Sequence, residues 1–490
     1  MMRSILIAAG LLSTWMCPTR AAAREALCSG CSVVLVTIDL LRADELRPAG
    51  GGKEIMPNLD AMAARGIVFS DVFSPSPDTM PSTLSIMNGL YPSHHGARVP
   101  LRDKAIQDKW AGSERTIAAV LRRQGYEVHG LYLDGSSTLN SLLGKEGPLG
   151  EPPSSGTLRG KKIFLQVRGG VHDPYAPALD DVRALQPEIA QTAYPTAEDV
   201  RRCEIASWLT KKVPESMRFS GELGEAGLVT VSEPFLDQAR RVVEGAGPAE
   251  RLRAVRELDP ESQYVLASLC YWSFFSSSTI DTARLLYDAE LRSVDRALGG
   301  MLRRLESEGL LDHTLVVVTS QHGEEFLEHG HVTHSAQLYE ESLHVPLILL
   351  LPGMKTGRVA GGVSSSVDVM PTILGALGIK PPGALDGRDL LHCLDGGCAE
   401  RYVFSECGDD TFSVRDDRYS YIQRPSREEL FDRRLDPGER HDIVSREPKA
   451  LSRMRAALSR EMTDRSDYKG RWPAWVSEKV RAQIIKEGYW

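Results

Sequence analysis

The stretch TLVVVTSQHGEE, Thr314–Glu325, joins a run of β-branched residues to a polar pair, Gln321 and His322. The run is short and almost continuously apolar, which is typical of a strand that is buried on both faces of a parallel sheet. The preceding stretch, Thr282–Ser307, is amphipathic with a helical period and predicts a long helix. A helix that leads into a buried strand, with polar residues where the strand ends, indicates an α/β sheet whose edge can bind a ligand.

The alternation of strand-like and helix-like segments recurs along the chain. Apolar runs predict strands at Ser32–Asp39, Glu127–Leu133, Ile163–Val167, Leu315–Thr319 and Val345–Leu351. Helical patterns cover Pro57–Arg65, Pro81–Met87 and Thr116–Gln124, and a glycine that favours a helix end follows them at Gly66, Gly89 and Gly125. We therefore predict an α/β fold with a large, mainly parallel sheet flanked by helices.

The chain divides into three parts by composition. Its 490 residues, 42% of them apolar and 25% charged, can bury a sizeable core. We predict an α/β domain at 24–385, and within it a charged, proline-broken helical insertion at 178–262. Shorter strand-like runs then indicate a small α+β C-terminal subdomain with a tail at 386–490.

The N-terminus is typical of a secretory signal peptide, which we place at 1–23. Arg3 begins a short basic region, Ile5–Met16 is apolar but too short to span a bilayer, and Ala21–Ala23 offers a cleavage site. This pattern predicts export to the periplasm or the extracellular space. Cys17 raises a lipoprotein alternative, but the residues before it match a lipidation site poorly.

Charge and cysteine content narrow the possible partners and the compartment. Removal of Arg3 and Arg20 with the signal peptide moves the formal net charge from −8 to −10, and no basic run offers a nucleic-acid surface. Eight cysteines include two close pairs, Cys28 with Cys31 and Cys393 with Cys398. In an exported protein these pairs are disulfide candidates, and zinc binding is the alternative that we consider less favourable.

Polar residues from distant segments are predicted to meet at one edge of the sheet. Asp39 ends the first strand, Gln321 and His322 follow a later one, and His172 lies just beyond Ile163–Val167. Thr79 precedes a predicted helix, whose N-terminus can bind a phosphate or sulfate. Each residue has an ordinary structural alternative: a loop cap for Asp39, a satisfied buried histidine for His322, and a helix N-cap for Thr79.

Several motifs, taken in order, resemble the sulfatase family of the alkaline phosphatase superfamily. These motifs are VTIDLLRADEL (Val36–Leu46), MPNLDAMAARGIVFSDVFS (Met56–Ser74), TMPSTLSIMNGLYPSHHG (Thr79–Gly96), VHDPYAP (Val171–Pro177), the segment Tyr287–Gly330 and ELFDRRLDPGERHDI (Glu429–Ile443). The resemblance extends from about Val33 to Arg446. It implies an alkaline-phosphatase-like α/β domain with a small antiparallel C-terminal subdomain.

The resemblance also implies a chemistry and the positions of its residues. One divalent cation, calcium or else zinc or manganese, would be bound by Asp39, Gln321 and His322. Thr79 matches the nucleophile, whereas His172 and His334 match positions that contact the ester. A local cluster in HGHVTH adds His329 and His331, with a spacing that could reach a metal. For His329 we favour the alternative, a polar exposed loop.

Departures from the family pattern bear on the activity. A threonine at position 79 excludes the formylglycine cofactor, because its Cβ carries a methyl group. A threonine nucleophile occurs in phosphodiesterases and phosphoethanolamine transferases of the superfamily, which favours phosphate esters. Gln321 replaces an aspartate, Ile38 replaces one carboxylate of a pair, and Thr83 replaces an arginine. Cations prefer anionic oxygen ligands, so metal binding should be weakened.

The sequence supports two functions. The first is an exported hydrolase of a sulfuric or phosphoric ester, with Thr79 as the nucleophile. The second is a catalytically impaired member that binds an anionic ligand or partner. In both cases we expect the ligand to be a sulfated or phosphorylated small molecule, glycan or lipid head group. The sequence does not fix the oligomeric state.

Overall fold

The structure is a computed structural model of the chain. It describes residues 26–47, 54–97, 113–132, 161–171, 175, 177, 179–188, 279–334, 337–394, 399–408 and 410–464. The predicted signal peptide, His172 and most of the predicted insertion therefore lie outside the described residues.

A seven-stranded sheet forms the centre of the molecule, in the order β10-β2-β9-β6-β1-β5-β4. Strand β9 is antiparallel to both of its neighbours, and the other pairs are parallel. The strands are β1 (Ser32–Ile38), β2 (Ile67–Phe69), β4 (Glu127–Tyr132), β5 (Ile163–Gly169), β6 (Thr314–Thr319), β9 (Leu347–Leu350) and β10 (Arg358–Ala360). This mainly parallel sheet confirms the predicted fold class.

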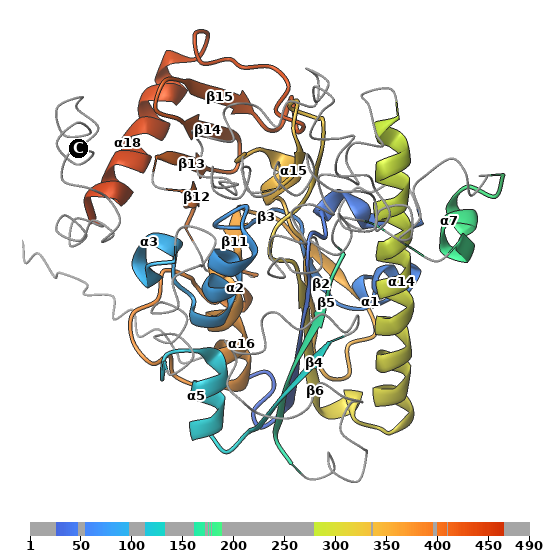
Figure 1. The fold of residues 1–490 in the computed structure, drawn as a ribbon. Coiled ribbons are helices and arrows are strands. Elements are labelled where there is room, and N and C mark those ends of the chain that lie inside the picture. The colour runs from blue at the N-terminus through green and yellow to red at the C-terminus, as the bar shows by residue number, and fades with distance from the viewer. Residues whose placement is uncertain are drawn as a thin grey trace, which may run out of the picture.

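Helices cover both faces of this sheet (Figure 1). One apolar core lies between the sheet and α1 (Pro57–Ala63), α7 (Leu179–Leu185) and α14 (Ile280–Ser307). A second core lies on the opposite face, against α2 (Thr79–Asn88), α5 (Ile117–Arg123), α16 (Val369–Leu377) and α17 (Leu390–Cys393). Alternation along β1 divides its side chains between the two cores, since Val34 faces the first and Leu35 the second.

Short elements connect these layers. They are η1 (Ala43–Glu45), β3 (Val72–Phe73), α3 (Pro92–His95), η5 (Leu311–His313), β7 (Glu325–Phe326), β8 (Val332–Thr333), α15 (Glu340–Leu343), β11 (Ser364–Ser365) and η6 (Ser366–Asp368). Strand β11 pairs with β3, and β7 pairs with β8 in a small hairpin. In the part of the chain that the structure describes, no helix is both long enough and apolar enough to cross a membrane.

The C-terminal part forms a separate four-stranded antiparallel sheet (Figure 1). Its strands are β12 (Val403–Cys407), β13 (Thr411–Arg415), β14 (Tyr419–Gln423) and β15 (Glu428–Asp432), and α18 (Pro448–Asp464) follows them. Met454 and Leu458 of α18 pack with Val414 and Tyr421 of this sheet. The antiparallel sheet and α18 therefore enclose an apolar core, to which Tyr91 and Val367 of the α/β domain also contribute.

One helix end differs from the sequence-based expectation. Gly66 does not end α1 in the left-handed region; instead it permits close packing, because a Cβ there would lie 2.6 Å from the carbonyl oxygen of Leu349. Gly89 does end α2 with a φ of 69°.

Cys28 and Cys31 form a disulfide, as predicted. Cys393 is also disulfide-bonded, whereas its predicted partner Cys398 lies outside the described residues.

His329 connects the β7–β8 hairpin to the C-terminal subdomain, so the prediction that it lies in an exposed loop is wrong. Its Nδ1 lies 2.5 Å from Oε1 of Glu341, and its Nε2 lies 2.8 Å from the carbonyl oxygen of Glu439. Both partners are acceptors, so both ring nitrogens must donate and the ring is cationic. The ring also stacks on Tyr339, with centroids 3.7 Å apart.

Asp295 caps a helix from outside its own segment. The residue before α1, Met56, has no capping side chain, and Asp295 of α14 accepts hydrogen bonds from the backbone N–H groups of Asn58 and Leu59 at 3.0 and 2.8 Å.

Asp295→Ala should lower the free energy of unfolding by about 1–3 kcal/mol, because buried amide donors lose their partner. Urea unfolding measures this. Glu306→Ala, on the exposed face of α14, should change stability by less than about 0.5 kcal/mol.

The contacts of His329 predict a pH-dependent stability. Its hydrogen bond to Glu341 raises its pKa above the usual value, against the opposing effect of burial. Because the pKa of His329 is higher in the folded than in the unfolded protein, protonation of His329 stabilises the folded state. This stabilisation is complete below the unfolded pKa, about 6.5, and is lost as the pH rises through the folded pKa. Thermal unfolding between pH 5 and 9 should show this loss in the wild type and a smaller loss in His329→Gln, because His344, whose pKa its ion pair with Glu340 raises against the effect of burial, still titrates there. The exposed His313→Gln variant should retain the wild-type profile.

Candidate active site

Two neighbouring parallel strands deliver the central residues of the site. Strands β1 and β6 pair in register, with Thr37 opposite Thr319, so both end at the same edge of the sheet. Asp39 follows β1 directly, and His322 lies in the loop after β6. Thr79 is the first residue of α2. The sequence-based expectation that these distant segments converge is met for Asp39, Thr79 and His322.

The hydroxyl of Thr79 lies between a nitrogen and a carboxylate. Its Oγ1 is 3.0 Å from Nε2 of His322 and 3.5 Å from Oδ2 of Asp39. Nε2 of His322 is itself 3.8 Å from Oδ1 of Asp39. Thr79 is not the N-cap of α2, because Asp78 occupies that position. The Thr79 hydroxyl is therefore directed into this cluster rather than used to cap the helix.

The surroundings of His322 fix its tautomer. Its ring is fully buried, and Nδ1 lies 2.9 Å from the carbonyl oxygen of Gly323. A carbonyl only accepts, so Nδ1 carries a hydrogen, and in the neutral form of the ring the lone pair lies on Nε2. The Thr79 hydroxyl therefore faces two acceptors, this nitrogen and Oδ2 of Asp39. This arrangement places the threonine oxygen against a base, as a nucleophile requires.

Gln321, in the same loop as His322, has a buried side-chain oxygen. The residue is 2% exposed, and its side-chain Oε1 has no hydrogen-bond partner. An unpaired carbonyl oxygen is costly to bury, and a cation would satisfy it. The donor set of Gln321, Asp39 and His322 therefore fits a divalent cation, with one negative charge among its three groups. Within the described residues, no three His, Cys, Asp or Glu side chains form a cluster suited to a metal.

His334 joins the site from the β7–β8 hairpin. Its ring lies against that of His322, with centroids 4.6 Å apart at an angle of 32°. The other predicted ester contact, His172, lies outside the described residues. Both ring nitrogens of His329 face protein acceptors, on Glu341 and Glu439. His329 therefore holds the hairpin in place and is not part of the site.

Hydrogen bonds from serines hold the loop that carries Gln321 and His322. Ser74 Oγ donates to the carbonyl oxygen of Gln321 at 2.5 Å, and Ser320 Oγ donates to that of His322 at 2.8 Å. At Gly323 a Cβ would lie 1.9 Å from the carbonyl oxygen of Glu341, so only glycine fits there. The loop therefore has little freedom to move.

Backbone strain flanks the site on two sides. Leu40, directly after Asp39, has a φ of 59°, and Thr333, directly before His334, has a φ of 71°. Residues with side chains rarely adopt this region, at a cost of about 1–3 kcal/mol each, and such strain concentrates at functional sites. The hydroxyl of Tyr287 donates to the carbonyl oxygen of Leu40 at 2.7 Å and so stabilises one of these turns.

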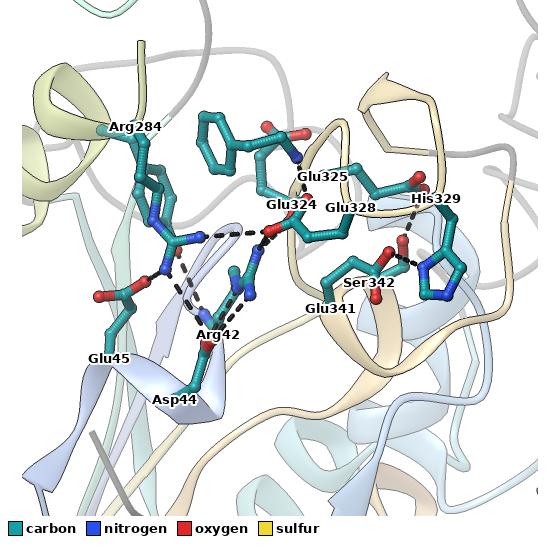
Figure 2. Close-up of polar contacts among 12 residues, drawn as sticks. Arg42, Asp44, Glu45, Arg284, Glu324, Glu325, Glu328, His329, Glu341 and Ser342 are labelled. Atoms are coloured by element: carbon teal, nitrogen blue, oxygen red, sulfur yellow. Dashed lines mark hydrogen bonds and ion pairs between the residues drawn. The ribbon is translucent and has the colours of Figure 1, made fainter. Parts of the chain in front are cut away.

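Sequence reasoning missed the charged network behind the site (Figure 2). Arg42 Nη1 donates to the carbonyl oxygen of Glu324 at 3.0 Å and pairs with Oε1 of Glu328 at 2.6 Å. Arg284 also approaches Glu328, at 3.5 Å. Burial and neighbouring carboxylates raise the pKa of Glu325 well above its usual range, which favours its neutral form. The double glutamate after His322 was the available signal, but its partners lie far away in the chain.

The family model described as Sulfatase matches residues 32–141 and 192–379, which is more than half of the chain. The chain belongs to the sulfatase family. A second family model, described as the C-terminal part of N-sulphoglucosamine sulphohydrolase, matches residues 328–467.

Similar sulfatase-family proteins include curated hydrolases. Arylsulfatase K of Rattus norvegicus is 24% identical over 441 residues, which cover 85% of this chain and 75% of that protein. The multifunctional alkaline phosphatase superfamily protein PehA of Trinickia caryophylli is 25% identical and covers 75% and 77%. The match to arylsulfatase K of Mus musculus reaches 31% identity but is local, covering 36% of this chain and 34% of the relative.

Solved structures share the sulfatase fold with this chain. One, determined in complex with its substrate D-glucosamine-2-N,6-O-disulfate, has a TM-score of 0.59 at 18% identity and covers 89% of this chain and 98% of its own. The phosphonate monoester hydrolase from Silicibacter pomeroyi has a TM-score of 0.56 at 20% identity, with 91% and 97% covered. These similarities confirm the predicted alkaline-phosphatase-like architecture.

The orphaned oxygen of Gln321 predicts how a carboxylate would act there. Gln321→Asp should tighten the binding of a divalent cation about tenfold or more, because ligand charge governs affinity. Isothermal titration with calcium, magnesium, manganese and zinc measures this. Gln321→Asn has the length of aspartate without its charge and should not tighten binding. Equal affinities in all three proteins would place residue 321 outside the coordination shell.

Proposed function

We propose that this protein is an exported sulfatase-family hydrolase that cleaves a sulfuric or phosphoric ester with Thr79 as its nucleophile. The observation that carries the proposal is the position of the Thr79 hydroxyl, 3.0 Å from Nε2 of His322 and 3.5 Å from Oδ2 of Asp39. Thr79 also lies at the N-terminus of a ten-residue helix, whose free amides and dipole favour an anionic ester.

The described residues support a two-step displacement. Thr79 gives up its proton toward the acceptors that it faces, His322 and Asp39, and its Oγ1 attacks sulfur or phosphorus. The bond to the leaving oxygen breaks, and we assign to His334, whose ring lies against that of His322, the proton that this oxygen takes up. Water then hydrolyses the ester formed on Thr79 and restores the hydroxyl.

A divalent cation fits this proposal. Asp39, Gln321 and His322 would hold it, and when bound it would supply positive charge to the ester oxygens. Nε2 of His322 would then be a ligand, which leaves Oδ2 of Asp39, 3.5 Å from Oγ1, as the acceptor of the Thr79 proton. The single carboxylate in this set makes the site less anionic than one with several aspartates. Ile38 cannot compensate, because its side chain is buried in the core on the α1 and α14 face of the sheet.

The names of the relatives support the class of substrate. A relative from Bacteroides thetaiotaomicron is described as a Δ4,5-hexuronate-2-O-sulfatase and is 24% identical over 84% of this chain and 84% of its own length. Other similar proteins are described as arylsulfatases and as a phosphonate monoester hydrolase. We therefore propose a sulfated or phosphorylated small molecule, glycan or lipid head group as the substrate.

Two observations support export. The first 23 residues have the pattern of a signal peptide, and Cys28 and Cys31, close behind them, form a disulfide. Disulfides persist in oxidising compartments such as the periplasm and the extracellular space.

A second candidate function is binding without turnover. The specific observation in its favour is the neutral Gln321, which leaves Asp39 as the only carboxylate of the donor set. On this alternative the protein binds the anionic ester through the same helix terminus and histidines but hydrolyses it poorly.

Substitution of Thr79 separates the two functions. Thr79→Ala should lower kcat/KM toward an aryl sulfate or aryl phosphate about 10³-fold or more, because the nucleophile is lost. Thr79→Ser retains a hydroxyl and should keep turnover within about tenfold. Release of p-nitrophenol, with each of the four cations in turn, measures both. Thr116→Ala removes a threonine that caps α5 instead and should leave kcat unchanged.

The outcomes discriminate clearly. Turnover by Thr79→Ala equal to that of the wild type would remove Thr79 as the nucleophile. No turnover of any ester by the wild type, together with saturable binding of the aryl ester, would favour the binding function.

A further inference from the structure

Glu324 lies beside the site but has no part in the mechanism above. Its side chain is completely buried, and its two carboxylate oxygens face different residues. Oε2 accepts a hydrogen bond of 2.8 Å from the hydroxyl of Tyr175. Oε1 has no hydrogen-bond partner and lies 3.6 Å from Nδ1 of His334. A buried carboxylate is costly unless both oxygens are satisfied, so the approach to His334 needs an explanation.

The register of the hairpin brings Glu324 and His334 together. In the β7–β8 pair, Glu325 lies opposite Thr333 and Phe326 lies opposite Val332. One further step along this antiparallel register places Glu324 opposite His334, and side chains of such directly opposed residues interact. The left-handed conformation of Thr333, with a φ of 71°, turns the chain just before His334.

Glu324 is fixed at its backbone as well as at its carboxylate. Its N–H donates to the carbonyl oxygen of Glu341 at 3.1 Å, and its carbonyl oxygen accepts from Arg42 at 3.0 Å (Figure 2). Tyr175, which is 1% exposed, packs edge-on against Tyr287, with centroids 5.7 Å apart. The carboxylate that faces His334 is therefore held rigidly.

A carboxylate that faces one ring nitrogen determines what the other nitrogen can do. It favours the hydrogen on Nδ1 of His334, which leaves Nε2 with its lone pair or with the second, transferable proton. Carboxylates that orient a functional histidine in this way are a common supporting device. The 3.6 Å separation is longer than a hydrogen bond, and such contacts often tighten only when substrate binds.

We propose that Glu324, held by Tyr175, is a positioning residue that fixes the orientation and tautomer of His334 so that its Nε2 faces the ester bound at Thr79. Only the kinetic consequence of this inference, a change in kcat, rests on the proposed function. The tautomer of His334 is a property of the resting protein and does not depend on turnover.

The first measurement is therefore spectroscopic. Nitrogen-15 NMR of the histidine rings in the full mature chain, with His334→Gln to assign the resonance, should show that Nδ1 of His334 carries a hydrogen in the wild type, both in the neutral ring and in the doubly protonated ring that can give its Nε2 proton to the leaving oxygen. Glu324→Ala should shift the population toward Nε2–H. Glu324→Gln should retain the wild-type tautomer, because its amide oxygen can still accept from Nδ1 while its NH2 group faces Tyr175.

The second measurement is kinetic and uses a matched control. Glu324→Ala should lower kcat about 10- to 100-fold with a smaller change in KM, and Glu324→Gln should restore most of the loss. Glu325→Gln alters the neighbouring, equally buried carboxyl group, which hydrogen-bonds Ser342 instead, and should leave both kcat and the tautomer of His334 unchanged.

Each result decides the proposal. An unchanged His334 tautomer in a folded Glu324→Ala variant would overturn it, and so would an equal loss of kcat in Glu325→Gln. If the wild type hydrolyses no ester, the proposed function fails, but the tautomer shift still tests the positioning role. If Glu324→Ala does not fold, Glu324→Gln and Tyr175→Phe provide the test, and a partial shift of the tautomer is expected in Tyr175→Phe.

Discussion

The parallel pairing of β1 with β6 is the constraint on which the site depends. Because the two strands run in the same direction in register, Asp39 and the loop with His322 emerge at one edge of the sheet. Thr79 then has to reach this edge from a different layer, and the packing of α2 on the second core places it there. A shift of this register would separate the carboxylate from the imidazole and leave the threonine without its acceptor.

Few charged groups lie close to the Thr79 hydroxyl, whereas many lie in the neighbouring network around Arg42 and Arg284. Gln321 contributes a neutral oxygen, so Asp39 is the carboxylate closest to the Thr79 hydroxyl among the described residues. Next to it, Glu328 pairs with both Arg42 and Arg284, and the backbone carbonyl oxygen of Glu324 accepts from Arg42 (Figure 2). Burial and neighbouring carboxylates raise the pKa of Glu325, and its neutral form lowers the negative charge of this network.

Local sequence patterns were sufficient to predict the fold and part of the site. The apolar runs predicted the buried strands, and the polar residues at their ends predicted the meeting of Asp39 with His322. Contacts set by tertiary packing were not readable: Gly66 is required by the carbonyl of Leu349, and His329 is held between Glu341 and Glu439. Glu324 was missed for the same reason, since its role depends on a hairpin register and on Tyr175.

The order of the strands also has a consequence during synthesis of the chain. Thr79 and His322 are 243 positions apart, and β1 cannot complete its pairing until β6 has been made. Such long-range pairing is slow, because the chain must first close a large loop. The nascent protein therefore carries Thr79 without its partner His322 while these 243 positions are made, and the cluster of Asp39, Thr79 and His322 forms only late in folding.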